Sequence, residues 1–150
     1  WLDPRHPSAL APGKRPRLTP NALLAFKNGR PWMPFGTPGG DAQVQTTLQF
    51  FLNQAVFEMT PQQAAEAPRF QSKSFPDSFW PHAYYPGRLD LEGRIDDDAA
   101  EELSRRGHLV NRLDDWARIT GDVCGITRDP DGGTVTAASD LRADAYAMAR

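Results

Sequence analysis

The 150-residue sequence predicts an α+β fold in which helices cover a mostly antiparallel sheet. Two turn signals support the sheet, because Asn28-Gly29 and residues 129–133 each separate two short runs typical of strands. Apolar residues recur at helical spacing between residues 41 and 57, which predicts a helix with a broad apolar face. Hydrophobic residues make up 39% of the chain and charged residues 24%, as is usual for one globular domain with its own core.

The charge and the cysteine content exclude several kinds of partner and site. The formal net charge is −2, so neither nucleic acid nor an anionic membrane is expected as a partner. No segment has the pattern of a transmembrane helix or a signal peptide, and the compartment, cytoplasmic or periplasmic/secreted, stays open. Cys124 is the one cysteine, which excludes an intrachain disulfide and a cysteine-rich metal site, and its apolar neighbours predict a buried strand position. The chain begins with Trp1 rather than methionine, from which we expect that its natural start has been removed.

Taken in order, the chain begins with a proline-rich segment. Residues 1–20 contain five prolines and predict an extended connector, whose basic residues we interpret as part of a solvated arm. The first hairpin follows in residues 21–35, and then the helix of residues 41–57. Thr60 as N-cap and Pro61 at the first helical position predict a second, short helix that runs to residue 67.

Residues 69–87 are rich in aromatic side chains and allow two interpretations. Either large apolar side chains hold a loop over the core, or the segment is a lid that lines a substrate site. His82 lies inside this segment, and a single histidine is more often a hydrogen-bonded loop residue than a base or a metal ligand.

The last third of the chain predicts one more helix between strands. Residues 88–93 alternate apolar and polar side chains, which predicts a strand with one solvent-exposed face. The acidic residues 96–98 open a helix that Gly107 ends, because acidic residues at the start and basic residues at the end match the helix dipole. Strands at residues 123–128 and 134–138 form the second hairpin.

The glycine-rich turn at residues 35–41 lies between the first hairpin and the long helix. A strand, a glycine turn and a helix start place the N–H groups of Gly39, Gly40 and Asp41 at the positive end of the helix, and glycine lets a ligand approach the backbone closely. This geometry suits a phosphate, a carboxylate or the oxyanion of an acyl-transfer intermediate. Phosphate fits least, because the lysine of a P-loop is missing and Asp41 carries a negative charge. A tight turn that only packs the helix on the sheet is the structural alternative.

No complete catalytic set can be assembled from the sequence. The chain has no G-x-S-x-G or H-E-x-x-H motif, and its three histidines, His6, His82 and His108, fall in an arm, a loop and a turn at a helix end. The acidic residues 96–98 hold a metal only with partners from elsewhere, so neither a metal nor another cofactor is expected. The glycine turn is therefore a candidate oxyanion cradle without its nucleophile.

Several motifs follow the order in which one enzyme family carries them, over nearly the whole chain from Gly13 onward. These motifs are Gly13-Lys14-Arg15-Pro16; Gly36-Thr37-Pro38-Gly39-Gly40; Thr46-Thr47-Leu48-Gln49 with Asn53; Ala67-Pro68-Arg69-Phe70; Arg105-Arg106-Gly107-His108; and Ala138-Ser139-Asp140 with Arg142. In these motifs the chain resembles the small subunit of the γ-glutamyltransferases. The resemblance implies the N-terminal-nucleophile hydrolase fold, a four-layer αββα sandwich, with residues 21–150 as the C-terminal portion of the small-subunit domain.

The resemblance also implies a function. In this family a precursor cleaves itself, and the new N-terminal threonine attacks an amide carbonyl and passes the acyl group to water or to an amine, without a metal or an organic cofactor. Gly39 and Gly40 correspond to the glycine pair whose N–H groups form the oxyanion hole. The expected partners are the missing large subunit, the N-terminal part of the small subunit, a small-molecule amide substrate and, in a homo-oligomer, a second copy of the chain.

Two departures from the family pattern bear on activity. The catalytic threonine lies upstream of the motif at residues 13–16 in the family, and Thr19 cannot replace it, because the mechanism needs a free α-amino group on the nucleophile's own residue. We therefore expect the chain alone to be inactive. The serine pair that holds the γ-glutamyl α-carboxylate is absent, so a related amidase with another acyl group is one hypothesis, with Arg17, Thr19 and Thr37 as candidate substrate-binding residues. A non-catalytic binding or structural module with the same sandwich is the alternative.

Overall fold

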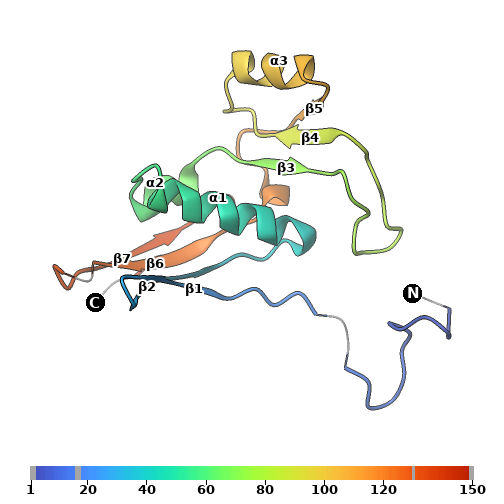
Figure 1. Ribbon diagram of the computed structural model, residues 1–150, viewed down its shortest axis with the longest axis horizontal. Helices are drawn as coiled ribbons and strands as arrows, with labels where there is room; N and C mark the ends of the chain where they lie inside the picture. The colour runs from blue at the N-terminus through green and yellow to red at the C-terminus, as the bar shows by residue number, and fades with distance from the viewer. Residues whose placement is uncertain (1–2, 16–17, 130, 149–150) are drawn as a thin grey trace.

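The computed structural model describes residues 3–15, 18–129 and 131–148 (Figure 1). In this part of the chain the strands are β1 (Leu23–Lys27), β2 (Arg30–Gly36), β3 (Phe70–Ser72), β4 (Arg88–Leu91), β5 (Leu109–Arg112), β6 (Cys124–Arg128) and β7 (Val135–Ser139). The α-helices are α1 (Gln43–Ala55), α2 (Pro61–Glu66) and α3 (Asp97–Arg105), and two short 3₁₀ helices are η1 (Gly40–Ala42) and η2 (Arg118–Thr120). The mixed α+β composition agrees with the prediction.

A four-stranded antiparallel sheet with the order β1-β2-β6-β7 forms the lower layer in Figure 1, and α1 and α2 lie on one of its faces. Both predicted hairpins, β1-β2 and β6-β7, are confirmed. Gly29 has the positive φ, 75°, that suits the tight turn of the first hairpin. The two hairpins meet through two residue pairs at one end of the sheet, Phe35 with Gly125 and Gly36 with Cys124. The glycine turn begins directly beyond this joint.

The core lies between the main sheet and its two helices. The Phe50 side chain of α1 is 1% exposed, and its ring lies so close to β6 that a Cβ on Gly125 would come within 2.7 Å of the ring. Glycine at position 125 therefore permits the close approach of helix and sheet. The buried side chains of this core are Met33, Phe35, Phe50, Ala64, Ala65, Val123 and Ala138.

The face that α1 turns towards the sheet differs from the predicted apolar face. Val44 and Leu48 are exposed, whereas Thr46, Thr47 and Gln54 are buried. The buried polar groups have partners: the Gln54 side chain, for example, accepts a hydrogen bond of 2.7 Å from a threonine of β6. Because these partners satisfy the polar face inside, part of the apolar stripe is left outside, where it borders an apolar groove along β1.

A second sheet with the order β3-β4-β5 lies above α1 and carries α3 on its outer side (Figure 1). β4 and β5 are parallel and are connected through α3, and Leu89, Leu91 and Ala100 form the small core between them. The sequence did not predict β3 and β5, which have three and four residues. The prediction of a solvent-exposed face on β4 was wrong, since Asp90 and the following Glu92 are at most 1% exposed. Arg88 of the same strand pairs with Asp90, and Arg142 from the C-terminal segment pairs with Glu92, which allows both acids to be buried.

The helix ends agree with their sequence signals. Thr60 Oγ1 accepts from the Gln63 N–H at 3.3 Å and the Gln63 side chain accepts from the Thr60 N–H at 3.0 Å, which is a capping box, and Pro61 opens α2. Asp96 caps α3 by accepting from the Asp98 N–H at 2.9 Å. These signals were predictable because all their partners lie within one helical turn.

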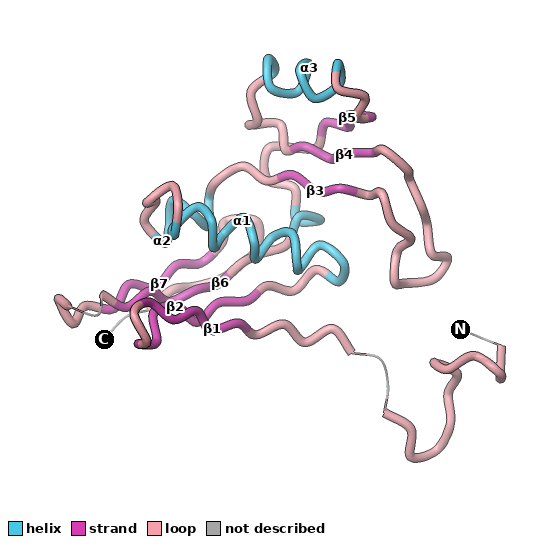
Figure 2. Tube along the Cα trace, viewed as in Figure 1, coloured by secondary structure: helices cyan, strands magenta, loops and turns pink. Residues whose placement is uncertain are grey.

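The second face of the main sheet is not covered by any described element (Figure 2). Leu24, Ile126 and Val135 on the strands of this sheet are 43–51% exposed. The predicted burial of Cys124 is wrong, because the thiol-bearing residue is exposed while its neighbour Gly125 lies under Phe50. We call the uncovered face of the main sheet, with Leu24, Ile126 and Val135, the open sheet face. In the described residues no helix is long and apolar enough to cross a membrane.

Two loop regions lie outside the layers. Residues 3–15, the N-terminal arm, contain turns but no helix or strand (Figure 2). The aromatic loop, residues 73–87, connects β3 to β4, and the interpretation that its side chains pack over the core is wrong, since Phe79, Trp80 and Tyr84 are at least 53% exposed. Backbone hydrogen bonds hold the loop instead, such as the 2.8 Å bond from the Asp77 N–H to the Ala83 carbonyl.

Candidate active site

The glycine turn joins the end of β2 to α1. Gly39 has φ 128° and Gly40 has φ 55°, both in the region that favours glycine. The Gln43 N–H donates to the Gly40 carbonyl, so η1 continues directly into α1. Among the described residues, no acceptor is found for the N–H groups of Gly39 and Gly40. Two N–H groups at the positive end of a helix are therefore available to an anion.

Thr37 and Gln43 hold the two ends of the turn. The buried Thr37 hydroxyl donates to the Pro38 carbonyl at 2.7 Å and accepts from the Asp122 N–H at 3.0 Å. The Gln43 side-chain amide donates both to the Thr37 carbonyl at 3.0 Å and to the Thr19 carbonyl at 2.9 Å. One amide group thus ties the predicted substrate-binding residues Thr19 and Thr37 to the start of α1.

Gly121 packs against the Gly39 side of the turn. A Cβ on Gly39 would lie 3.5 Å from the Gly121 Cα, and a Cβ on Gly121 would lie 2.8 Å from the Thr37 hydroxyl. The Thr46 hydroxyl of α1 donates to the Thr120 carbonyl. The segment after η2 is consequently pressed between the turn and α1, with no room for a side chain at position 121.

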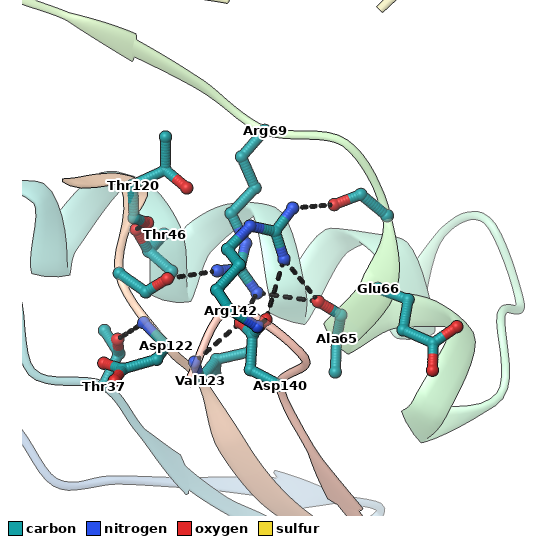
Figure 3. A network of polar contacts seen from close by, with 12 residues as sticks. Thr37, Thr46, Ala65, Glu66, Arg69, Thr120, Asp122, Val123, Asp140 and Arg142 are labelled. Atoms are coloured by element: carbon teal, nitrogen blue, oxygen red, sulfur yellow. Dashed lines mark hydrogen bonds and ion pairs between the residues drawn. The ribbon is translucent and has the colours of Figure 1, made fainter. Parts of the chain in front are cut away.

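Beside this segment, which Figure 3 shows with Arg69, Asp140 and Arg142, four charged side chains form a buried ionic network. They are Arg69, Glu92, Asp140 and Arg142, none of which is more than 6% exposed. Arg69 Nη2 lies 2.5 Å from Asp140 Oδ2, and Arg142 Nη1 lies 2.9 Å from Asp140 Oδ1. Arg142 also donates to both Glu92 carboxylate oxygens, through Nε and Nη2. Two positive and two negative charges balance one another, as burial of charge requires.

The buried ionic network is connected to the glycine turn through Gly121. Arg69 Nη1 donates to the Gly121 carbonyl at 2.8 Å, and Asp140 Oδ2 accepts from the Val123 N–H at 3.0 Å. Figure 3 shows the guanidinium groups of Arg69 and Arg142 close to each other and to Asp140. The position of residues 121–123 therefore depends on charges contributed by distant parts of the chain.

Burial acts differently on the two arginines. It lowers the pKa of the Arg69 guanidinium below its ordinary value, and the charge of Asp140 offsets only part of this effect. Burial also disfavours the charged form of Arg142, but its hydrogen bonds with Glu92 and the charge of Asp140 outweigh burial and raise its pKa. Arg142 thus holds its proton more strongly than Arg69 does.

A cleft of about 790 Å³ lies on the Gly40 side of the turn, between the N-terminal arm and the aromatic loop. Asp41 Oδ2 accepts from the Ser78 N–H at 2.5 Å, which attaches the aromatic loop to the first turn of the helix. The edge of the Phe79 ring fills the space that a Cβ on Gly40 would take, at 2.7 Å. The lining residues are Pro7, Ser8, Ala9, Leu10, Ala11, Lys14, Arg15, Leu18, Thr19, Ser78, Phe79, Trp80 and His82.

The structure brings together most of the residues that the sequence singled out. Thr37, Gly39 and Gly40 lie in one turn, and Thr19 is joined to this turn through Gln43. Arg17 lies outside the described residues. In the described part of the chain no three or more His, Cys, Asp or Glu side chains are placed to hold a metal. The buried ionic network could not be predicted from the sequence, although its arginines stand in motifs already noted, because charge pairing between distant segments has no local signal.

Comparison with known proteins decides the family. A family model described as Gamma-glutamyltranspeptidase matches residues 1–150. The chain belongs to the γ-glutamyltranspeptidase family. Solved γ-glutamyltranspeptidases share its fold, which confirms the predicted N-terminal-nucleophile hydrolase class.

Relatives in the γ-glutamyltranspeptidase family carry several different names. The chain is 31% identical to the glutathione hydrolase-like YwrD proenzyme of Bacillus subtilis strain 168, over 98% of this chain and 27% of that protein. It is 34% identical to the Acylase ACY 1 proenzyme of Pseudomonas sp. strain V22, over 99% of this chain and 24% of that protein. The solved structure of LmbA2991HD is 41% identical, with a TM-score of 0.84 over 95% of this chain and 25% of that chain. The chain thus spans about a quarter of the length of these γ-glutamyltranspeptidase relatives.

Proposed function

We propose that the chain is part of an amide-cleaving enzyme in which Gly39 and Gly40 donate their N–H groups to the oxyanion of a tetrahedral intermediate. Membership of the γ-glutamyltranspeptidase family supports amide hydrolysis or acyl transfer as the reaction. The observation that carries the proposal is the pair of N–H groups at the start of η1 for which the described residues offer no acceptor. Donors fixed in this way stabilise charge that develops in the transition state.

The proposed reaction uses a threonine outside this chain as nucleophile, with its own α-amino group as base. The threonine hydroxyl adds to the amide carbonyl carbon, and the electron pair of the carbonyl moves to its oxygen, where the two glycine N–H groups bind it. When the carbonyl re-forms, the carbon–nitrogen bond breaks and the amine leaves with the proton that the base has taken from the hydroxyl. Water or a second amine then attacks the acyl-enzyme ester and releases an acid or a new amide.

The acyl group is proposed to be a group other than γ-glutamyl, or one held by other contacts than the family's serine pair. Thr19 lines the cleft beside the turn, and the bond from Gln43 fixes its backbone, which supports it as a substrate contact. Arg17 remains a candidate on sequence grounds. Thr37 is proposed to act through the shape of the turn, because its hydroxyl already bonds to the Asp122 N–H.

Substitution of Gly39 in the complete enzyme tests the proposal. Gly39→Ala forces a side chain onto a backbone with φ 128° and displaces the adjacent N–H groups, so we expect kcat to fall by about 10²–10³ and KM to change much less. Gly29→Ala is the matched control, since Gly29 also has positive φ, 75°, and no atom lies within 4 Å of the added Cβ. Single-turnover acylation and the thermal midpoint are measured on the same preparations.

Each outcome of this comparison has a distinct meaning. A folded Gly39→Ala enzyme with normal turnover would remove the turn from the active site. A loss of folding without a loss of turnover in the remaining folded protein would favour the tight-turn alternative. Failure of the complete wild-type protein to cleave any amide would favour a non-catalytic module with the same fold.

A further inference from the structure

The cleft beside the glycine turn has a mainly apolar wall and a positive side. Its lining includes the rings of Phe79 and Trp80 and aliphatic residues of the arm such as Leu10. Lys14 and Arg15 supply positive charge, and no Asp or Glu belongs to the described lining. Arg15 forms no ion pair with any described residue. Such a wall suits a ligand that combines an apolar ring with a negative charge.

The aromatic wall of the cleft is attached to the proposed oxyanion site. Asp41 in the first turn of the helix holds the Ser78 N–H, and the next residue, Phe79, places its ring edge against Gly40. The His82 N–H donates to the Phe79 carbonyl at 2.6 Å, which fixes the backbone on the other side of the ring. Phe79 therefore stands at the boundary between the cleft and the glycine N–H groups.

We propose that this cleft binds the acyl group of the substrate, and that this group is an aromatic or ring-sized apolar acyl chain ending in a carboxylate. The inference rests on the proposed function, because the contact between Phe79 and Gly40 assigns the cleft to the reaction. With the scissile carbonyl at Gly40, the ring lies against Phe79 and Trp80 and the carboxylate faces Lys14 and Arg15. Phe79 is then a specificity residue, and Asp41 is a positioning residue that acts through Ser78.

Four p-nitroanilides test the proposal on the complete enzyme: acetyl, phenylacetyl, 4-carbamoylphenylacetyl and 4-carboxyphenylacetyl. The ratio of kcat/KM between phenylacetyl and acetyl measures recognition of the ring, and we expect it to exceed about ten. The ratio between the carboxyl and carbamoyl substrates measures recognition of charge at nearly equal shape. We expect this second ratio to be about three to ten at low salt and to decrease at high salt.

Variants with matched controls locate the contacts. Phe79→Ala should lower the ring preference up to about tenfold, whereas Phe75→Ala, in the same loop and outside the cleft lining, should leave the ratio unchanged. Arg15→Ala should remove most of the charge preference. Arg5→Ala is its control, because Arg5 lies on the same arm, pairs with Asp3 at 3.1 Å and does not line the cleft.

The readouts separate this proposal from the proposed function. A wild-type preference for acetyl, or equal ratios in Phe79→Ala and Phe75→Ala, would overturn the assignment of the cleft while amide cleavage stands. Values of kcat/KM that change with the leaving amine and not with the acyl group would overturn the assignment of the cleft as well. If no amide is cleaved, calorimetric titration with 4-carboxyphenylacetate decides: binding that Phe79→Ala and Arg15→Ala weaken supports the cleft, and no binding to the wild-type protein overturns it.

Discussion

Arg69 donates a 2.8 Å hydrogen bond to the carbonyl of Gly121, and Gly121 in turn packs against Gly39. A guanidinium that is 2% exposed thus supports the backbone on which the proposed oxyanion donors rest. Replacement of Arg69 is expected to change both the stability of the fold and the geometry of the turn.

Arg69→Met is predicted to lower the free energy of unfolding by about 3–5 kcal/mol, because it leaves Asp140 buried with one partner fewer. Arg105→Met is the control, since Arg105 pairs with Glu102 at the surface, where its side chain is 70% exposed, and should cost less than about 1 kcal/mol. Urea unfolding of the complete enzyme gives both values. Equal losses in the two variants would contradict a structural role for the buried ionic network.

Gly40→Ala is predicted to lower kcat by at least about a hundredfold and to leave KM nearly unchanged. The added Cβ would meet the Phe79 ring at 2.7 Å, so crowding alone is a competing explanation. The double variant Gly40→Ala/Phe79→Ala removes the crowding. Single-turnover rates of the wild-type enzyme, the two single variants and the double variant together form a double-mutant cycle. We expect the double variant to stay slow on acetyl p-nitroanilide; recovery of the Phe79→Ala rate would assign the loss to crowding instead.

γ-Glutamyl p-nitroanilide is predicted to be a poor substrate of the complete enzyme compared with other amides. The reason is that residues 16–20 lack the serine pair expected to hold the γ-glutamyl α-carboxylate. Steady-state kinetics on γ-glutamyl and phenylacetyl p-nitroanilides measure the difference. A γ-glutamyl KM in the ordinary micromolar range together with efficient turnover would show that other residues replace the serines.

Cys124 is predicted to react with iodoacetamide in the chain expressed alone and to be protected in the complete enzyme. The thiol-bearing residue is exposed beside the open sheet face, which a second sheet would cover in an αββα sandwich. Burial and the nearby Asp122 raise the pKa of this thiol above its ordinary value. Because the thiolate is the reactive form, we expect the alkylation rate of Cys124 to level off at a higher pH than the rate of an ordinary cysteine. Mass spectrometry of the peptide containing Cys124 follows the reaction, and equal rates in both proteins would mean that the face stays open.

The chain expressed alone is predicted to self-associate through the apolar groove between α1 and β1. Val44 and Leu48 are 72% and 55% exposed, and with Leu23 they line this groove. Val44→Glu and Leu48→Glu should therefore shift sedimentation towards the monomer. Ile119→Glu, at a residue that is 57% exposed and outside the groove, is the control and should have little effect. A wild-type chain that sediments as a monomer would contradict the prediction.

The elements that could be predicted from sequence are those whose causes are local. The turn at Asn28-Gly29, the caps at Thr60 and Asp96, and the glycine turn before α1 each depend on residues a few positions apart. Local signals also placed Gly39 and Gly40 at a helix start, and the geometry agrees. Their catalytic role remains a prediction.

The features that sequence reasoning missed depend on distant partners. Glu92 looked like the exposed residue of an alternating strand, but Arg142, fifty positions later, neutralises it inside the protein. The apolar stripe of α1 was assigned correctly to a helix, yet which part of it faces the sheet is decided by buried bonds such as that of Gln54. Cys124 was placed correctly on a strand, but the burial prediction was wrong, because no described element covers its side of the sheet (Figure 2).

The joint of two residue pairs between β2 and β6 has a consequence for the order of folding. Each hairpin contains only contacts between residues close in sequence, which form early because little loop-closure entropy is lost. The glycine turn takes its support from both hairpins, since Thr37 follows β2 and Asp122 precedes β6. The two hairpins can therefore form separately, but the turn acquires its shape only when they dock, so the proposed anion-binding turn forms at the end of folding.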